Sequence, residues 1–374
     1  MKTTHNIFFQ NSSSMAPIPD ASVHLVVTSP PYPMIEMWDD MFARQNSRIP
    51  KALKGNDGLK AFELMHRELD RTWQELHRIL IDGGLACVNI GDATRTVGGE
   101  FRLYPNHIRI LTAMSQTGFS ALSLILWRKP TNAPNKFMGS GMLPAGAYVT
   151  LEHEYILILR KGAKREFGSP AQKRIRRASA LFWEERNHWF SDVWLGLIGA
   201  QQKMQKDSAR LRSGAFPFEL AYRLVNMYSV KGDTVVDPFL GTGTTMWAAV
   251  ASGRNCVGFE IVGDFHDVIK SQKDKVVARS NDRIRRRIQE HLDYIESHGD
   301  DRGKFKYINR HYKFPVMTRQ EVELFLNPLE RIEQIDANTL KVVYTAAPQD
   351  DFEGDWKDLL PPRSQKTGNR LSLW

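Results

Sequence analysis

The sequence predicts an α/β fold built around a mostly parallel β-sheet, and two patterns carry this prediction. Short runs of β-branched and aliphatic residues alternate with longer amphipathic segments along the chain, as they do where strands and crossover helices follow one another. Several of the short runs also lack the apolar–polar alternation of a half-exposed strand. Strands of that kind are typical of a parallel sheet with both faces covered by helices.

The expected elements follow one another between short turns. The strands, in chain order, are His5–Gln10, Val23–Thr28, Gly84–Ile90, Ala121–Arg128, Tyr155–Arg160, Thr234–Asp237, Asn255–Glu260 and Leu340–Thr345. The clearest helix is Leu59–Ile81, in which apolar residues recur three or four positions apart. Phe218–Tyr228 and Thr244–Ser252 are the next clearest helices, and Asp82-Gly83-Gly84 predicts a turn after the first helix.

The composition limits the class of protein. The 374 residues carry a net charge of +9 and are 42% hydrophobic, which is ordinary for a soluble globular chain and suits, without proving, a polyanionic partner. Cys87 and Cys256 are the only cysteines and lie in apolar runs, so we expect reduced thiols and no disulfide or cysteine metal site. No apolar run approaches the ~20 residues that span a bilayer, and the N-terminal one is too short for a signal peptide. We expect a cytoplasmic protein.

The first motif, Thr28-Ser29-Pro30-Pro31-Tyr32, ends an apolar strand. Its two prolines fix the backbone and remove two donors, which leaves carbonyl groups pointing outward at a strand's carboxyl end, where open α/β sheets bind ligands. These carbonyls and the Ser29 hydroxyl can accept hydrogen bonds from an amino group, and Tyr32 offers a ring on which a base can stack. An exocyclic base amine is a poor nucleophile, so acceptors that orient its lone pair favour methyl transfer without a covalent intermediate or a metal.

The second motif is Asp237-Pro238-Phe239-Leu240-Gly241-Thr242-Gly243-Thr244-Thr245. Gly241 and Gly243 allow the backbone to approach a ligand closely, and Glu260, about 20 residues on and at the end of the next strand, is placed to bond ribose hydroxyls. The spacing is not the dinucleotide fingerprint, and no pyrophosphate cradle is evident. The motif therefore favours a cofactor that has a ribose and no phosphates.

Together the motifs resemble those of the permuted (β-group) amino-methyltransferases of DNA, over roughly residues 5–262. The catalytic motif precedes the cofactor motif, which is the permuted order. Further segments that resemble the family are Asn89–Asp92, Leu126–Lys129, His153–Leu157 and Phe216–Leu220. The resemblance implies a Rossmann-like fold dependent on S-adenosylmethionine, with a seven-stranded, mostly parallel sheet in circularly permuted order.

The resemblance also implies roles for single residues. The catalytic residues would be Ser29, Pro30, Pro31 and Tyr32. The residues holding S-adenosylmethionine would be Asp237, Pro238, Phe239, Gly241, Gly243, Thr244, Glu260, Asp92 and Phe216. Asp92 could instead cap a turn, and no metal is expected.

Serine at the first position of the catalytic motif is typical of cytosine-N4 enzymes, and aspartate of adenine-N6 enzymes. Ser29 is a neutral donor and acceptor, whereas aspartate only accepts. Serine also occurs with adenine in this family, so adenine N6 is the alternative target. An RNA methyltransferase is disfavoured by the motif order, and a catalytically silent DNA-binding module by the intact Ser-Pro-Pro-Tyr.

Double-stranded DNA is the partner that the resemblance implies, and a cognate restriction endonuclease would act on the same site. The target base must be flipped out of the duplex. Residues 164–212, with eleven Lys and Arg against five Asp and Glu, are the expected recognition insertion. Candidate contacts to phosphates are Lys173, Arg174, Arg176 and Arg177, and candidate readers of base edges are Arg186 and Asn187. A solvated basic loop is the alternative.

The expected division of the chain follows from these assignments. Residues 1–163 and 213–267 would form the catalytic domain, and residues 268–374 a C-terminal extension. Arg283, Arg285, Arg286 and Arg287 in the extension could face the DNA backbone, although a charged helix is more often only solvated. The sequence leaves open whether the protein is a monomer or a homodimer.

Overall fold

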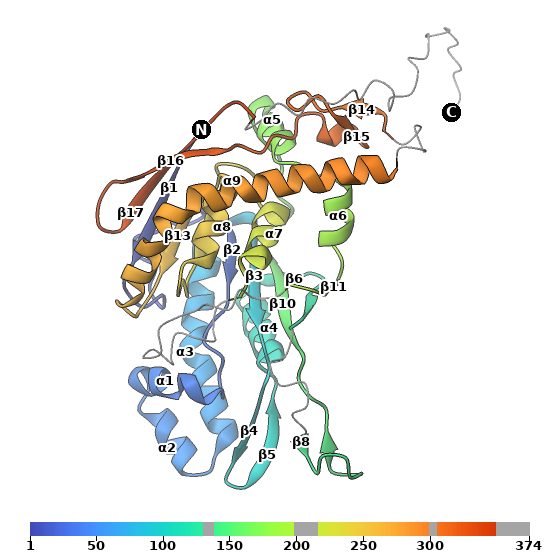
Figure 1. The fold of residues 1–374 in the computed structure, drawn as a ribbon. Helices are drawn as coiled ribbons and strands as arrows, with labels where there is room; N and C mark the ends of the chain where they lie inside the picture. Colours follow the sequence, from blue (N-terminus) through green and yellow to red (C-terminus); the bar gives the residue numbers. More distant parts are fainter. Residues whose placement is uncertain (130–137, 198–215, 299–304, 349–374) are drawn as a thin grey trace.

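The computed structural model describes residues 1–129, 138–197, 216–298 and 305–348, which form one large mixed sheet with helices on both faces (Figure 1). At the centre lie five parallel strands. In sheet order they are β3 (Leu80–Ile90), β2 (Val23–Thr28), β12 (Thr234–Asp237), β13 (Asn255–Phe259) and β1 (Lys2–Phe8). The early strand β2 pairs directly with the late strand β12, so the permuted order is confirmed.

Mostly antiparallel pairs of strands extend the sheet at both edges. Beside β3 lie β10 (His153–Lys161), then β7 (Ile125–Arg128) and β6 (Phe119–Ala121), with β11 (Val193–Trp194) outermost. Beside β1 lie β17 (Thr339–Tyr344) and β16 (Leu329–Gln334). The seven strands expected of the catalytic sheet are therefore present, and β17 corresponds to the eighth predicted strand, Leu340–Thr345. With β6, β11 and β16 the described sheet has eleven strands.

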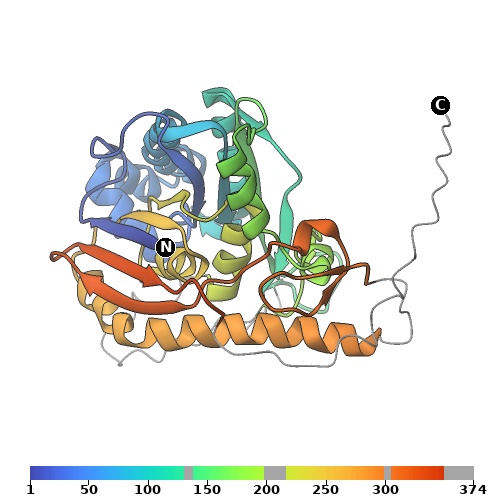
Figure 2. The same ribbon diagram turned by 90° about the horizontal axis from the view of Figure 1, so that it is seen from above.

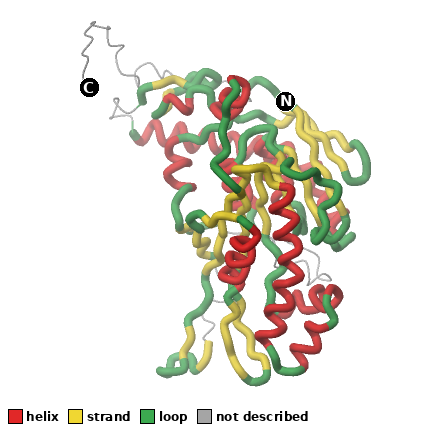
Figure 3. Tube along the Cα trace, turned by 180° about the vertical axis from the view of Figure 1, so that it is seen from behind, coloured by secondary structure: helices red, strands yellow, loops and turns green. Residues whose placement is uncertain are grey.

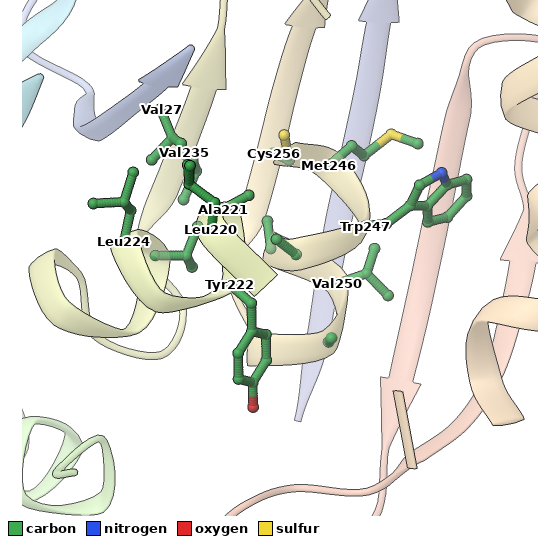
Figure 4. Close-up of a cluster of buried hydrophobic side chains, with 14 of the residues drawn as sticks. Val27, Leu220, Ala221, Tyr222, Leu224, Val235, Met246, Trp247, Val250 and Cys256 are labelled. Carbon is green, nitrogen blue, oxygen red and sulfur yellow. The ribbon is translucent and has the colours of Figure 1, made fainter. Parts of the chain in front are cut away.

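Two helical layers bury the two faces of the sheet. On one face pack α3 (Gly58–Ile79) and α4 (Asn106–Thr117), and on the other α7 (Phe218–Tyr228) and α8 (Thr244–Ser252). Leu25 and Val27 of β2 point to the second layer and Val26 to the first, because successive side chains of a strand face opposite ways. Figure 4 shows Val27 and Val235 packed against Leu220 of α7. This two-sided burial explains why the strands lack polar alternation.

The carboxyl ends of the parallel strands carry several insertions, which project at the bottom of Figure 1 and are seen from behind in Figure 3. They comprise the 3₁₀ turn η1 (Glu36–Trp38), helices α1 (Asp39–Gln45) and α2 (Arg48–Lys54), hairpin β4 (Ala93–Val97) to β5 (Glu100–Tyr104), and hairpin β8 (Met138–Gly139) to β9 (Ala147–Tyr148). They surround the end of the sheet at which the catalytic motif lies.

The opposite end carries most of the regions that the sequence analysis set apart from the catalytic domain. They are α5 (Pro170–Ala178), α6 (Trp183–Trp189), the second half of the long α9 (Phe265–Ser297), the short strands β14 (Tyr307–Ile308) and β15 (Pro315–Val316), and the turn η3 (Arg319–Glu321). Phe182 joins Ile284, Ile288 and Phe314 in one buried cluster. The expected insertion and the C-terminal extension thus share a core, to which α9 contributes Ile284 and Ile288. Figure 2 shows α9 running along the length of the molecule.

Two local predictions differ from the structure. Asp82-Gly83-Gly84 is not a turn between the helix and the next strand: β3 begins at Leu80 and continues through these residues, with an irregularity in its pairing to β2 and with Gly83 at φ +80°. The glycines therefore form a bulge, in which a positive φ is available to glycine. The strand predicted over Ala121–Arg128 is divided into β6 and β7. By contrast β2, β12, α7 and α8 have the predicted bounds.

The C-terminal extension is part of the main fold. Strand β17 pairs antiparallel with β1, from Lys2 opposite Val343 to Asn6 opposite Thr339. It therefore covers an edge of the sheet that would otherwise expose unpaired backbone groups. Within the described residues, no helix has the length and apolar character needed to cross a membrane.

Candidate active site

The two motifs meet at adjacent strand tips. Thr28, the last residue of β2, donates its hydroxyl to Asp237 Oδ1 at 2.6 Å, and Asp237 is the last residue of β12. The Thr245 hydroxyl donates to the Val27 carbonyl at 3.1 Å, and both partners are buried. These bonds exist only because β2 and β12 are parallel neighbours, so the catalytic and cofactor motifs share one end of the sheet.

The cofactor motif forms a glycine turn closed by an acid. Gly241 and Gly243 have φ values of +52° and +83°, a region that glycine adopts without strain. Glu260 accepts the Gly241 N–H and the Val262 N–H, each at 2.8 Å. A Cβ placed on Gly241 would meet open space, since the nearest heavy atom is the Phe239 carbonyl oxygen at 4.0 Å. The turn therefore leaves room beside a carboxylate whose remaining lone pairs can accept further hydrogen bonds.

The electrostatics of this turn suit a cationic, phosphate-free ligand. Burial raises the pKa of Asp237 to about 6, although the Thr28 hydroxyl partly opposes that rise. Burial likewise raises the pKa of Glu260. Neither the motif from Asp237 to Thr245 nor Gly258–Glu260 contains a lysine or arginine that could neutralise phosphates. The donor and acceptor set thus fits the ribose and the positive charges of S-adenosylmethionine.

The catalytic motif is held in a hydrogen-bond network. Ser29 Oγ donates to Tyr32 Oη at 3.1 Å, and Tyr32 Oη donates to Glu154 Oε2 at 2.9 Å. Asn89 Nδ2 donates to Tyr32 Oη at 3.1 Å and to Glu154 Oε2 at 2.6 Å, and Lys129 Nζ donates to Glu154 Oε1 at 2.8 Å. Burial and the Glu154 charge raise the pKa of Tyr32, so the phenol keeps its proton.

A cavity of about 300 Å³ opens beside this network. Its aromatic wall is formed by Tyr32, Trp38, Trp127 and Phe216, and its polar wall by Asn89, Asp92, Lys129 and Glu154, with Pro30 and Gly91 between them. A mixed aromatic and polar lining of this size suits a flat heterocycle that must be both stacked and hydrogen-bonded. Pro30, Tyr32, Asp92 and Phe216 were predicted for the site, and the structure brings them together here.

Two buried residues hold the catalytic segment in place. Asn106, at the start of α4, donates to the Pro33 carbonyl at 3.1 Å and to the Gly91 carbonyl at 3.0 Å, and its oxygen lies 2.9 Å from His66 Nε2. A Cβ at Gly91 would lie 3.1 Å from a Tyr32 ring carbon. Asn106 therefore ties the segment after Tyr32 to the tip of β3, and Gly91 leaves room for the ring.

Asp92 lines the cavity but has its bonds elsewhere. Both of its carboxylate oxygens lie 2.8 Å from His107 Nδ1, and Oδ1 also accepts the His107 N–H at 3.1 Å. The structure thus supports the turn-capping alternative for Asp92, at the first turn of α4. A contact between Asp92 and the cofactor stays a prediction.

The predicted phosphate contacts on α5 lie at the other end of the sheet. Lys173, Arg174, Arg176 and Arg177 are exposed, but α5 is joined to residues that precede β12. Lys231 N–H donates to Ser179 Oγ at 3.0 Å, and Arg165 pairs with Asp233 at 2.6 Å. Because β10 runs antiparallel to β3, it carries the chain away from the cavity. The structure does not bring these four cations to the site, so their contact with DNA there stays a prediction without geometric support.

The remaining predicted DNA contacts differ in outcome. Arg186 and Asn187 are exposed on α6 and do not line the cavity, so their role is still only predicted. Arg283 and Arg287, by contrast, are buried, and the prediction that they face DNA is wrong. Arg283 pairs with Glu219 at 2.9 Å, and Arg287 pairs with Glu185 at 2.5 Å and 2.7 Å. They lie one helical turn apart on the inner face of α9, whereas Arg285 and Arg286 face solvent.

Sequence reasoning gave no site role to four residues that the structure places in or beneath the site: Asn89, Lys129, Glu154 and Asn106. Asn89 and Glu154 lie in segments quoted for the family resemblance, at the cavity ends of β3 and β10. Position at a strand tip was therefore a usable signal for them. Asn106 carries no such signal, because its partners Pro33 and Gly91 are distant in sequence. No group of His, Cys, Asp or Glu among the described residues could hold a metal ion.

Comparisons with known proteins give consistent matches. A family model described as DNA methylase, N6_N4_Mtase, matches residues 23–271. The type II methyltransferase M.MthZI of Methanothermobacter thermautotrophicus is 49% identical over 346 residues, which cover 92% of this chain and 96% of that protein. The type II methyltransferase M.MjaI of Methanocaldococcus jannaschii is 47% identical over 281 residues, covering 72% and 91%.

One solved structure is similar in sequence and in fold. TTHA0409, a putative DNA modification methylase from Thermus thermophilus that was crystallised with S-adenosyl-L-methionine, is 32% identical to this chain. It superposes with a TM-score of 0.56 and covers 74% of this chain and 95% of its own.

Proposed function

The chain belongs to the N6/N4 family of DNA methylases, and from that premise we propose that it methylates cytosine N4 in duplex DNA with S-adenosylmethionine as methyl donor. The observation that carries the proposal is the bond between Thr28 and Asp237 at 2.6 Å. This bond holds the catalytic motif, which would orient the target amine, beside the glycine turn of the cofactor motif. That turn suits a positively charged ligand that carries a ribose. Such proximity supplies the orientation that direct methyl transfer requires.

The cofactor motif would hold the methyl donor, and the catalytic motif would orient the target amine. S-adenosylmethionine supplies a methyl group on a sulfonium centre, and the amine nitrogen takes it as the carbon–sulfur bond breaks. The turn from Asp237 to Thr244 and the Glu260 carboxylate would hold this donor. The Ser29 hydroxyl and the Pro30 carbonyl would accept the amine hydrogens and aim the nitrogen lone pair, while Tyr32 stacks on the base. The methylated nitrogen would then release one proton to solvent.

Cytosine is favoured over adenine by Ser29, the residue typical of cytosine-N4 enzymes. Adenine N6 is the second candidate, because the cavity of about 300 Å³ has room for either base. The names of the relatives as type II methyltransferases support a further proposal, that this protein protects DNA from a restriction endonuclease with the same recognition site.

The duplex would approach the carboxyl end of the sheet. Hairpin β4–β5 follows the cavity residue Asp92, and hairpin β8–β9 leads to the cavity residue Leu151. Phe101 and Tyr148, one on each hairpin, stack with ring centroids 4.8 Å apart although both are exposed. Three further exposed apolar residues follow on the second hairpin and its loops: Met142, Leu143 and Val149. Apolar side chains of this kind can fill the gap that a flipped base leaves in a duplex.

The test is methyl transfer followed by nucleoside analysis. The protein is incubated with tritiated S-adenosylmethionine and duplex DNA, single-stranded DNA or RNA, and the modified nucleosides are identified by mass spectrometry. We expect N4-methylcytosine from the duplex. N6-methyladenine as the sole product would replace cytosine with the second candidate, and transfer to RNA alone would overturn the DNA assignment.

A further inference from the structure

We propose that Glu154 is a positioning residue that makes the Ser29 hydroxyl an acceptor for the target amine, by fixing the direction of the hydrogen bonds through Tyr32. This inference rests on the proposed function, since it concerns the same site. A serine hydroxyl can donate or accept a hydrogen bond, whereas an amine nitrogen whose lone pair is to be freed needs acceptors for its hydrogens.

The direction of the hydrogen-bond chain follows from the carboxylate. Glu154 is 7% exposed and accepts hydrogen bonds from Tyr32, Asn89 and Lys129. An ionised carboxylate can only accept, so the Tyr32 proton must point to Glu154. The phenol oxygen is then left as an acceptor, and Asn89 Nδ2 donates to it at 3.1 Å.

The direction of the Tyr32 hydrogen bond also fixes that of Ser29. With the Tyr32 proton directed to Glu154, the contact of 3.1 Å between Ser29 Oγ and Tyr32 Oη has Ser29 as its donor. The serine hydrogen is thereby occupied, and the oxygen can offer only its lone pairs to a target amine held beside Pro30 and Tyr32. A neutral serine is thus given the acceptor character that an aspartate has by itself. Without Glu154 the phenol could turn its proton toward Ser29, and the serine could donate to the amine.

The network also fixes the ring on which the base would stack. The hydroxyl end of Tyr32 is held by Glu154 and Asn89, and the ring packs over Gly91, where an added Cβ would lie 3.1 Å from Tyr32 and 3.3 Å from Glu154 Cγ. Stability alone does not account for this arrangement, because a buried carboxylate is costly and its only cationic partner in the network, Lys129, is half-exposed.

The test is a double-mutant cycle in the full-length protein. Glu154→Leu removes the acceptor, Glu154→Gln keeps one, and each is made with Tyr32 present and with Tyr32→Phe. With Tyr32 present, we expect Glu154→Leu to lower kcat for duplex DNA on the order of 10- to 100-fold, and Glu154→Gln to restore most of that loss. In the Tyr32→Phe background, where the chain to Ser29 is already broken, we expect Glu154→Leu to cost less than about threefold.

Three outcomes decide the question. Equal losses in both backgrounds, or no loss in either, would overturn the positioning role. Should Glu154→Leu fail to fold, as shown by its melting temperature and by the Kd for S-adenosylmethionine, Glu154→Ala, which also removes the acceptor, takes its place in the cycle with the same prediction. Wild-type protein that transfers no methyl group to DNA would refute the proposed function instead, so the two failures are distinguishable.

Discussion

The two ends of the central sheet both bury polar and charged side chains, but they satisfy them differently. At the carboxyl end, Ser29 bonds Tyr32 and Tyr32 bonds Glu154, and the last two residues line a cavity. At the amino end, Arg254 and Arg287 are 1% exposed and are enclosed by protein. The carboxyl end keeps hydrogen-bond acceptors facing a space that a ligand can enter. At the amino end, the guanidinium donors of both arginines are bonded to acceptors within the protein.

Arg254 illustrates the amino end. Its guanidinium donates to the Ser229 carbonyl at 2.7 Å and to the Ser252 carbonyl, at the carboxyl ends of α7 and α8. These carbonyls lack partners within their helices and carry the negative end of the helix dipole. Burial still lowers the pKa of Arg254 to about 10. A basic residue in this chain is therefore not a DNA contact by default, because some of the positive charge stabilises the fold.

The largest effect should come from breaking the amino end. Arg287→Met leaves Glu185 buried without its bidentate partner, and we expect a loss of about 3–5 kcal/mol in the free energy of unfolding. Urea unfolding would measure it, and kcat of the protein that remains folded should be unchanged. The double variant Arg287→Met/Glu185→Leu should recover much of the stability. An Arg287→Met variant with unchanged stability and a reduced kcat would show instead that Arg287 serves the reaction and not the fold.

The opposite pattern is expected at the carboxyl end of β2. Ser29→Ala removes an acceptor for the amine, and we expect kcat to fall on the order of 10²–10³-fold with little change in melting temperature or in the Kd for S-adenosylmethionine. Ser22→Ala is the matched control, since Ser22 immediately precedes the same strand at its other end and its hydroxyl donates to the Pro19 carbonyl, away from the site. Equal losses in the two variants would sink the assignment.

The buried Asp237 predicts a pH-dependent difference. Its pKa in the folded protein is about 6, above that of an unfolded aspartate, so the folded state binds the proton more tightly. Wild-type stability should therefore fall, relative to Asp237→Asn, as pH rises from about 4 to about 6, by roughly 2–3 kcal/mol in total. Urea unfolding of the cofactor-free proteins across pH 4 to 7.5 would show it. Parallel curves for the two proteins would contradict it.

The hairpin β8–β9 gives a smaller effect at the carboxyl end. Leu143→Ser/Val149→Ser should raise KM for duplex DNA about tenfold, because each apolar side chain removed should cost roughly 0.7 kcal/mol of contact with the gap that the flipped base leaves. The variant should act on a substrate with a mismatched target base almost as well as wild type, since such a base is already easily flipped. An equal loss on both substrates would show that the hairpin does not assist flipping.

The smallest effect is expected on α5. Replacement of Lys173, Arg174, Arg176 and Arg177 by glutamine should change kcat/KM for duplex DNA less than about twofold, because exposed charges beyond a Debye length of ~8 Å at physiological salt are largely screened from the site. The assay belongs at ~0.15 M salt. A loss above tenfold in kcat/KM would show that α5 contacts the DNA. It would contradict the conclusion that only the carboxyl end of the sheet faces the substrate.

The sequence alone predicted the α/β class and the bounds of β2, β12, α7 and α8 because those features are local. Aliphatic runs, helical spacing and a glycine turn are each visible in neighbouring residues. They determine which segments can form buried strands and helices. The sequence also placed Ser29, Tyr32, Gly241 and Glu260 at strand tips, since parallel strands joined by crossovers present the same ends to one side.

Tertiary structure decided what depends on direction and on distant partners. Because β10 runs antiparallel to β3, Glu154 reaches Tyr32 at one of its ends while α5 is carried to the other end of the sheet. The helical period of α9 turns Arg283 and Arg287 inward and Arg285 outward, which a count of charges cannot distinguish. Asn106 joins Pro33 to Gly91 across three segments. Such contacts arise only once the chain is folded, because the free energy of a buried polar group depends on which partners the packing brings to it.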